Sequence, residues 1–329
     1  MVTLSQIALP TMLRNGYSQS VAAGSVAAAG TVGIILPPAV MLFFLSSEFQ
    51  VPIGSMFMST VVPGAILMLC YMINYMVNGV IRPPDLTAAA IDRPDSVIAW
   101  ILLLIRGLIM PVGLIVLVLG SIMMGWATPS QSGAIGAAGG LLLIILNGRL
   151  SWTLFKDLIN TTANLSAMVF FIIIAAAVFF YPFRYFSGDT LIVEALSTPN
   201  LGPWFMLLLI IGIVFILGFF IDWIEITVIT LPLFVPVLQG LDFTEHVGGG
   251  PLPMLWIAAI TALVLQTSFL TPPFGFALFF LKGSAPPGVT LAHIYRGVMP
   301  IVVIQIAVIV AILKFPDIVI WLPKLAYGS

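Results

Sequence analysis

The sequence predicts an all-α protein that crosses a membrane several times and has interrupted helices near its centre. Of its 329 residues, 61% are hydrophobic and only 7% are charged, a composition that soluble globular domains do not have. Long apolar runs alternate with short polar loops along the whole chain, and two of the runs contain a double proline at their middle. We therefore expect residues 1–329 to form a single membrane domain.

Composition also limits the function classes. The formal net charge is −1 and no basic patch occurs, so the sequence gives no indication of nucleic-acid binding. Cys70 is the single cysteine, so no internal disulfide is expected, and its apolar surroundings indicate a packing residue. The first residues lack the basic region of a secretory signal peptide, so we expect none to be cleaved.

The first part of the chain contains a short helix and an interrupted one. Residues 3–13 predict an apolar helix too short to span, and a turn follows at residues 14–17. Residues 20–48 form the first interrupted segment, with Pro37-Pro38 at its middle. Residues 55–80 are long enough for a full span, because a helix needs roughly 20 residues to cross the hydrocarbon. A proline-stiffened polar linker then covers residues 81–95.

The middle of the chain predicts connecting spans. Residues 97–124 are apolar throughout, and the loop at 125–132 contains Thr128-Pro129, which suits the start of the next helix. Residues 133–147 are rich in glycine and alanine, which favours close helix packing. We expect a short interfacial helix at residues 151–160 and a separate span at 161–181.

Residues 204–237 differ from the other spans. Two short apolar arms flank Asp222-Trp-Ile-Glu225, so the pattern favours a re-entrant hairpin with two carboxylates at its tip over one long kinked helix. A glycine- and proline-rich loop follows at 240–253, then the second interrupted segment at 255–282 and a last span at 297–316.

The double prolines require both interrupted helices to break. Proline donates no backbone hydrogen bond, and it also pushes the preceding residue out of helical geometry. In Thr267-Ser-Phe-Leu-Thr-Pro-Pro-Phe-Gly275 the break therefore falls at Thr271-Pro272-Pro273, near the middle of the membrane. Freed backbone groups are tolerated there only inside protein or beside a water-filled cavity. Paired broken segments in two halves of a chain indicate a transport site, although two kinks without function are the alternative.

Positive charges support the hairpin. If the turn at Arg14 is cytoplasmic and 204–237 enters and leaves from the outer side, most cationic residues fall in cytoplasmic connections. The helix at 3–13 is then the last arm of a matching hairpin from the inside, and the two halves are inverted repeats. The cytoplasmic set is Arg82, Arg93, Arg149, Lys156, Lys282 and Arg296, with Arg106 close to it, and the outer set is Arg184, Lys314 and Lys324.

Four motifs in order resemble a known family. They are Gly30-Thr-Val-Gly-Ile-Ile-Leu-Pro-Pro38, Gly125-Trp-Ala-Thr-Pro-Ser-Gln-Ser132, Gly218-Phe-Phe-Ile-Asp222 and Thr271-Pro-Pro-Phe-Gly-Phe-Ala-Leu-Phe279. Each motif alone is weak, but four in register over essentially the whole chain resemble the large membrane subunit of tripartite ATP-independent periplasmic (TRAP) transporters.

The resemblance implies a multi-pass protein of the bacterial inner membrane that imports an organic acid with sodium as the coupling ion. It implies an elevator mechanism, a small membrane subunit and a periplasmic substrate-binding protein as partners, and no bound cofactor. The expected parts are the end of the first hairpin with the first broken helix (1–54), connecting scaffold helices (55–200), the second hairpin with the second broken helix (201–285), and the last helix with its tail (286–329).

The sequence departs from the family pattern in two places. Family members carry a further N-terminal part, including the tip of the first hairpin, so Met1 is expected to be an internal start or the start of a fragment. The acidic Asp222-Trp-Ile-Glu225 also stands where small and hydroxyl residues are commoner, which indicates a distinct subfamily or a modified ion site.

Sodium is a hard cation that prefers oxygen ligands, which broken helices supply from carbonyls and hydroxyls. Their N-terminal ends attract a substrate carboxylate. Asp222 is the expected charged ligand or gate, because an ionisable residue within a membrane segment usually has a function. The alternative is that Asp222 and Glu225 lie at an aqueous hairpin tip and only cap a helix. The candidate sodium- and substrate-binding residues are Gly30, Thr31, Gly33, Pro37, Pro38, Asp222, Thr267, Ser268, Thr271, Pro272, Pro273 and Gly275.

The other polar residues give weaker indications of function. Arg106 is expected to reach the membrane interface rather than a substrate carboxylate, and His246 and His293 are expected at the surface. No enzyme is predicted, because Asp222 has no aspartate partner deep in another span and no zinc-protease or phosphate-loop motif occurs. A truncated non-transporting remnant or assembly subunit is the main alternative function, and a channel is a weaker one.

Overall fold

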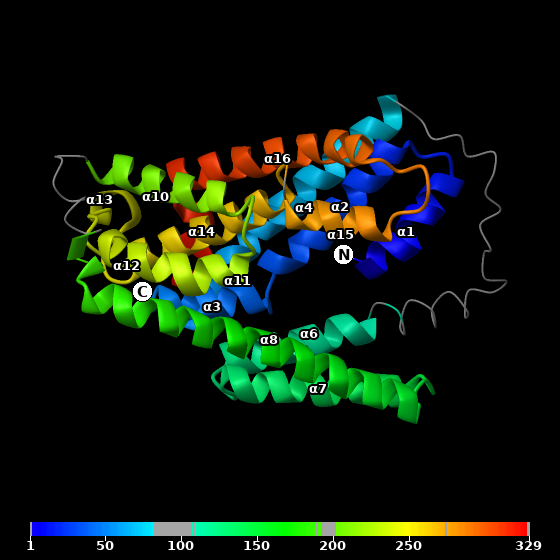
Figure 1. The fold of residues 1–329 in the computed structure, drawn as a ribbon, viewed down its shortest axis with the longest axis horizontal. Coiled ribbons are helices and arrows are strands. Elements are labelled where there is room, and N and C mark those ends of the chain that lie inside the picture. Colours follow the sequence, from blue (N-terminus) through cyan, green and yellow to red (C-terminus); the bar gives the residue numbers. More distant parts are fainter. Residues whose placement is uncertain are drawn as a thin grey trace. The chain divides into compact units, whose positions relative to one another are not determined.

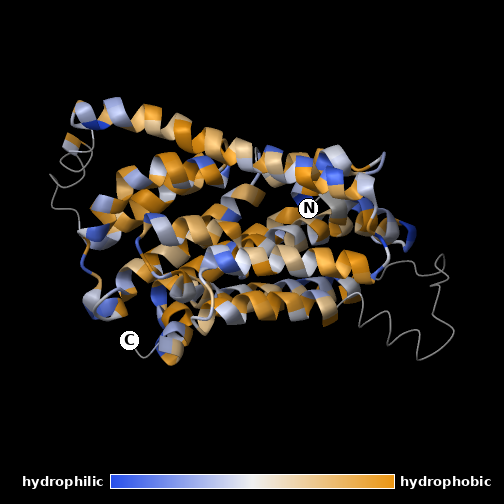
Figure 2. Ribbon diagram, turned by 90° about the horizontal axis from the view of Figure 1, so that it is seen from below, coloured by the Kyte–Doolittle hydropathy of each residue, from blue (hydrophilic) through white to orange (hydrophobic). Residues whose placement is uncertain are grey.

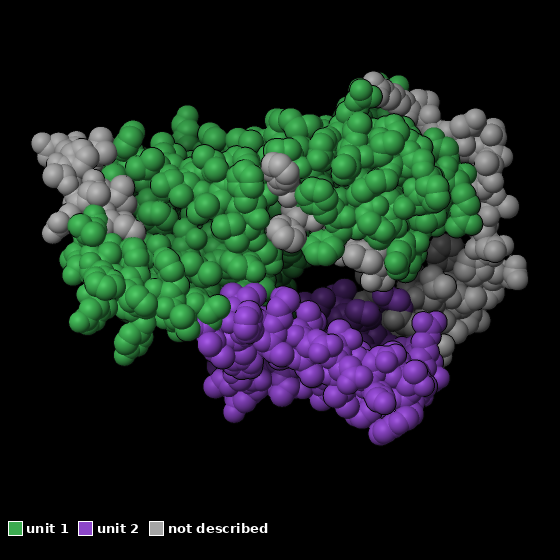
Figure 3. Space-filling model, viewed as in Figure 1, with its two compact units in different colours: residues 1–89, 175–329 green, residues 90–174 purple. Residues whose placement is uncertain are grey.

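The computed structural model describes residues 2–81, 107, 109–188, 190–191, 202–273 and 275–327. Its residues divide into two compact units, residues 1–89 with 175–329 and residues 90–174 (Figure 3), and each unit is described by itself. The expected linker at 81–95, the first part of the span at 97–124, and Arg82, Arg93 and Arg106 lie outside the described residues.

The larger unit begins with the predicted hairpin arm and broken helix. α1 covers Val2–Arg14 and α2 covers Gln19–Ile35, whose first turn is capped by the Ser18 hydroxyl accepting from the Val21 N–H at 3.3 Å. α2 and α3 (Val40–Glu48) bend by 44° at the double proline, as predicted. α4 (Ile53–Ile81) then forms the full span.

The same order of elements returns in the second half of the larger unit (Figure 1). In both halves a broken helix is followed by a long helix with an interior proline; α1 precedes the first broken helix, and a hairpin precedes the second. The elements are α10 (Pro203–Leu217), α11 (Trp223–Glu225), a π-helical turn (Ile226–Thr230), α12 (Leu231–Gln239), α13 (Thr244–Val247), α14 (Leu252–Leu270), α15 (Phe276–Ser284), α16 (Leu291–Lys314) and α17 (Asp317–Tyr327).

Residues 203–239 form a hairpin and not one kinked helix. The ring of Trp204, at the start of α10, lies 5.2 Å from the ring of Phe243, just after α12. The chain therefore returns to its point of entry, and both arms pack against each other. The π-helical turn directly precedes Pro232, whose missing N–H removes one hydrogen bond from the normal helical pattern. We call residues 218–223 the hairpin tip and Trp204 with residues 243–246 the hairpin root.

The smaller unit consists of α6 (Met110–Met123), α7 (Pro129–Leu146) and the first part of α8 (Trp152–Tyr185). Thr128 starts α7 with a capping box, because its hydroxyl accepts from the Gln131 N–H while the Gln131 side chain accepts from the Thr128 N–H. The hydroxyls of Ser121 and Ser132 join α6 to α7 at 2.8 Å.

Two sequence predictions about helix boundaries were wrong. The interfacial helix at 151–160 and the span at 161–181 are one helix, α8, because no proline or glycine interrupts the junction and the Thr162 hydroxyl bonds back to the Leu158 carbonyl. The last span is followed by a further helix, α17, which packs on α4 and buries Val319 and Ile320.

Only some of the helices are long and apolar enough to cross a membrane. In the described part of the chain, five helices pass this test, or six spans if α2 and α3 together count as one bent span. Hydrophobic residues run along the helices, and hydrophilic ones gather mainly at their ends and turns (Figure 2). This confirms an all-α polytopic membrane protein. α14 is the most deeply buried of the five, so the helix that leads to the second break lies in the interior of the larger unit, whereas Thr271 and Pro272 of the break are half-buried and Pro273 is exposed.

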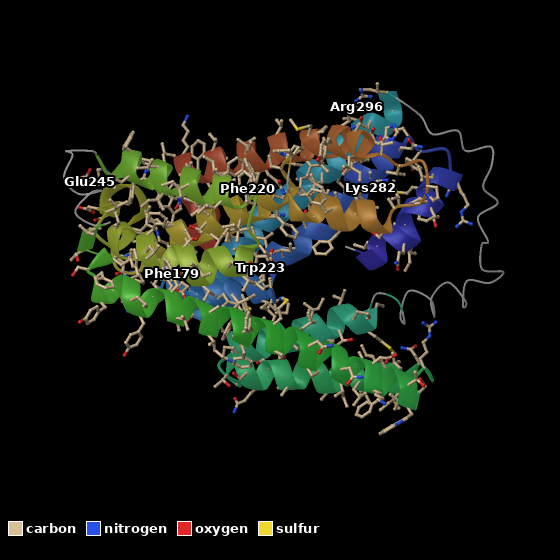
Figure 4. All side chains as sticks on the ribbon, viewed as in Figure 1. Phe179, Phe220, Trp223, Glu245, Lys282 and Arg296 are labelled. Carbon is tan, nitrogen blue, oxygen red and sulfur yellow. The ribbon has the colours of Figure 1, made fainter. Side chains whose placement is uncertain are left out.

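Within the larger unit, the charged loops sort to opposite ends. Lys282 and Arg296 lie at one end with α1, whereas Glu245 lies at the other end with the hairpin root (Figure 4). Lys314 also belongs to the root end, since the neighbouring Leu313 carbonyl lies 2.8 Å from His246 Nε2. This arrangement agrees with the predicted separation of the two sets of positive charges.

Candidate functional site

The first break lies between α2 and α3. Thr31 is fully buried one turn before the end of α2, Gly30 is half-buried and Gly33 is exposed. The backbone turns at Pro37-Pro38, a cis peptide, with Pro37 half-buried and Pro38 exposed. The predicted donors of this segment therefore stand on one stretch of helix, but only Thr31 faces the protein interior.

The second break is more enclosed. Thr267 and Ser268 are buried in the last turn of α14, and Thr271 is half-buried at its end. The turn at Pro272-Pro273, also a cis peptide, closes when the Gly275 N–H donates to the Thr271 carbonyl at 3.1 Å.

Gly275 has a steric requirement for glycine at this turn. A β-carbon at position 275 would stand 2.7 Å from the Phe269 carbonyl oxygen and 3.0 Å from that of Thr271. Any other side chain would therefore push the backbone of the break apart.

All four predicted hydroxyls use their hydrogen in the same way. Thr31 Oγ1 donates to the Ala27 carbonyl at 3.0 Å, and the hydroxyls of Thr267, Ser268 and Thr271 donate to carbonyls three or four residues earlier, at 2.7, 2.9 and 2.7 Å. A hydroxyl whose proton is already donated keeps its oxygen lone pairs for an acceptor role. These oxygens therefore have the chemistry of cation ligands.

The hairpin tip packs against both broken helices. Gly218 lies directly against Ser268, since a β-carbon at 218 would stand 2.5 Å from the Ser268 β-carbon. On the other arm, the Trp223 ring meets Phe44 of α3 edge-on at 6.0 Å (Figure 4 labels Trp223). The tip thus joins the second half of the first broken helix to the end of α14.

Asp222 occupies the position before α11. Its backbone is extended and it stands at the N-cap of α11, although its side chain forms no capping hydrogen bond with that helix. Asp222 is half-buried, and Glu225 has one carboxylate oxygen that is buried without a hydrogen-bond partner among the described residues. Within the described chain, no hydrogen bond joins Asp222 to either break.

Sequence reasoning missed three contacts at the breaks. Gln266 Nε2 donates to the Thr31 carbonyl at 3.4 Å, and Tyr295 of α16 donates to the Pro273 carbonyl at 2.7 Å. The third is the contact of Gly218 with Ser268. The contact of Gln266 could have been expected, because Gln266 is a polar residue inside the apolar run of α14. The other two contacts depend on packing between distant segments.

His246 is not the surface residue that the sequence predicted. It is half-buried in an aromatic cluster at the hairpin root, with its ring 4.9 Å from Trp204 and 5.5 Å from Trp256. Trp256 Nε1 donates to the Ile312 carbonyl at 3.0 Å, so both side chains satisfy carbonyls at the end of α16. Nearby, the Thr244 hydroxyl donates a hydrogen bond to the Asp242 carboxylate and lowers its pKa, and the Thr244 N–H lowers it further.

The described residues contain no group of three or more His, Cys, Asp or Glu side chains that could hold a transition metal. His293 instead serves in a capping box with Thr290 at the start of α16.

Comparison with known proteins gives a consistent result. A family model described as "Tripartite ATP-independent periplasmic transporter, DctM component" matches residues 1–318. The C4-dicarboxylate TRAP transporter large permease protein DctM of Pseudomonas aeruginosa is 27% identical over 98% of this chain and 71% of its own length. The ectoine/5-hydroxyectoine TRAP transporter large permease protein UehC of Ruegeria pomeroyi is 26% identical, over 97% and 71%. The sialic acid TRAP transporter large permease protein SiaM of Vibrio cholerae is 25% identical, over 99% and 72%.

Proposed function

The chain belongs to the DctM family of TRAP transporter components, and from this premise we propose that it imports an organic acid across the bacterial inner membrane, coupled to sodium. The family consists of transporter permeases and not enzymes, which agrees with the absence of catalytic motifs in the sequence. The chain is a large permease subunit, whose partners would be a small membrane subunit and a periplasmic substrate-binding protein.

The observation that carries the proposal is the pair of broken helices. Each helix ends inside the protein, so carbonyls and hydroxyls gather where an ion must lose its water. The hydroxyl protons of Thr31, Thr267 and Thr271 are already donated to carbonyls of their own helices. Sodium would take the remaining lone pairs together with free carbonyls of the breaks, as hard cations do.

A carboxylate substrate fits the other side of each break. α3 and α15 both begin just after a double proline, and their first N–H groups have no partner within the helix. These groups and the helix dipole favour a negative group. The relatives named for C4-dicarboxylates and sialic acid support an organic acid as the substrate class.

Asp222 is the proposed charged ligand or gate. It lies half-buried in the hairpin tip, between Gly218, which contacts Ser268, and Trp223, which contacts Phe44. A tip in contact with both broken helices is in a position to respond to occupancy of either break. We propose that the hairpins and broken helices move together as the transport domain of an elevator mechanism, which their mutual packing within the larger unit supports.

The test is reconstitution. The chain, its small membrane subunit and its binding protein would be placed in proteoliposomes, and uptake of labelled C4-dicarboxylate and sialic acid measured under an inward sodium gradient or a matching potassium gradient. Saturable uptake that requires sodium supports the proposal. No uptake of any tested acid would favour a non-transporting assembly subunit, whereas non-saturable flux without the binding protein would favour a channel.

A further inference from the structure

Thr31 and Gln266 hold the same position in two copies of one motif. Each is the sixth residue before the first proline of a double proline, and each double proline is followed by a nine-residue helix, α3 or α15. Each copy then continues into a long helix with an interior proline, Pro63 in α4 or Pro300 in α16. Residues 19–81 and 252–314 are therefore structural repeats.

The two equivalent residues contact each other. Gln266 Nε2 donates to the Thr31 carbonyl at 3.4 Å, and both residues are buried. α2 starts at the end of the unit that holds α15, and α14 starts at the opposite end beside α13, so the two helices run in opposite directions (Figure 1). In an arrangement with a two-fold axis, equivalent residues meet only near that axis. The Thr31–Gln266 pair therefore marks the pseudo-two-fold axis between the two broken helices.

This hydrogen bond is an unusual link for its surroundings. The facing parts of α2 and α14 are otherwise mostly apolar or carry hydroxyls bonded within their own helix. Gln266 reaches a carbonyl of the other helix, and its own Oε1 is buried without a partner among the described residues. The bond to the Thr31 carbonyl is the only hydrogen bond that the Gln266 side chain makes in the described structure, so this buried amide is held by its link to the other broken helix.

We propose that Gln266 is a positioning residue that couples the two breaks. The amide fixes α14 to α2 six residues before each double proline, so a shift that an ion or substrate causes at one break is transmitted to the other. This inference rests on the proposed transport function, since the two breaks are its binding elements. The coupling acts through a direct contact between two helices, which is a physical path and not only spatial proximity.

Three variants isolate the amide. Gln266→Met keeps the length of the side chain but removes the donor. Gln266→Glu keeps the shape, and its carboxyl can donate to the Thr31 carbonyl only when protonated. Gln305→Met is the matched control, because Gln305 is also a fully buried glutamine, lies in α16 beside Tyr71, and forms no hydrogen bond to either break in the described structure.

The measured quantity is the sodium concentration that gives half-maximal uptake, compared with the maximal rate. We expect Gln266→Met to raise the half-saturating sodium concentration by about tenfold, a typical coupling between sites, with a shallower dependence on sodium. Gln266→Glu should match Gln266→Met at high pH and approach the parent as the pH falls, with each value normalised to the parent at the same pH. Gln305→Met should leave the half-saturating concentration unchanged.

The inference is overturned if Gln266→Met has the sodium dependence of the parent, if acid does not restore Gln266→Glu, or if Gln305→Met shifts sodium dependence equally. A parent without sodium-dependent uptake would refute the proposed function instead.

In that case the hydrogen bond between Gln266 and Thr31 is tested as a link between the two helices by thiol labelling of Gly33→Cys in a Cys70→Ala background, since position 33 is exposed and has open space for a side chain. Labelling must accelerate in Gln266→Met but not in Gln305→Met, and equal rates reject the link.

Discussion

Gly218 at the hairpin tip lies against Ser268 of α14, with no room for a side chain between the two backbones. A β-carbon added at position 218 would stand 2.5 Å from the β-carbon of Ser268. Real atoms do not approach so closely, so the glycine sets how near the tip comes to the second break. The geometry of a predicted ligand, Ser268, thus depends on a glycine 50 residues away in the sequence.

Gly218→Ala should therefore displace the tip. We expect a loss of stability of about 1–3 kcal/mol, the usual range for overpacking, together with a strong loss of uptake. Ser268→Gly in the same chain removes the clashing atoms, so the double variant should regain the thermal stability that Gly218→Ala loses. If the stability change of the double variant, measured by thermal unfolding, equals the sum of the changes of the two single variants, the two residues do not contact each other in the protein.

The Thr271 hydroxyl should be essential for sodium-dependent uptake. It ends α14 with its proton donated to the Thr267 carbonyl at 2.7 Å, which leaves its oxygen free to bind a cation. Thr271→Ala is expected to abolish uptake without preventing membrane insertion, whereas Thr271→Ser keeps the oxygen and should retain measurable uptake. Full uptake by Thr271→Ala would remove this residue from the site.

Asp222→Ala should also abolish sodium-dependent uptake while the protein still inserts into the membrane. The matched control is Asp242→Ala, because Asp242 is an exposed aspartate in the loop after the same hairpin, hydrogen-bonded only to Thr244 in the described structure. The control variant should transport normally. Equal loss of uptake in both variants would indicate damage to the hairpin and not removal of a ligand.

Two helical glycines should respond in opposite ways to alanine. At Gly24 of α2, a β-carbon would stand 2.6 Å from the Gly297 carbonyl carbon of α16, so Gly24→Ala should destabilise the protein by about 1–3 kcal/mol. Gly212 of α10 has no atom within 4 Å of the added carbon, so Gly212→Ala should be neutral or stabilise by up to about 1 kcal/mol. Thermal unfolding of the two purified variants measures both effects, and a neutral Gly24→Ala would show that α2 and α16 lie further apart.

Several features of the fold were predictable because they depend on local chemistry. Pro37-Pro38 and Pro272-Pro273 cannot continue a helix, so both breaks occur where the sequence predicts them. The acidic interruption at Asp222 between two short apolar arms correctly indicated a hairpin. The four motifs likewise identified the family that the comparison confirms.

The failures also have local reasons. The sequence predicts a helix boundary between residues 160 and 161, but polar side chains such as Asn160 do not end a helix unless the backbone changes, so α8 continues through them. The sequence places His246 in a loop and therefore predicts it at the surface, whereas its ring packs on Trp204 and Trp256 of two other helices.

The sequence by itself determined where the helices break, which oxygens stand at the breaks and which family the chain belongs to, because prolines, apolar length and motif order act along the chain. Only the tertiary structure decided that Gly218 meets Ser268, that Gln266 meets Thr31, and that His246 and Trp256 hold the end of α16. These contacts join segments that lie between 50 and 235 residues apart, and their geometry depends on how whole helices pack, which no local pattern encodes.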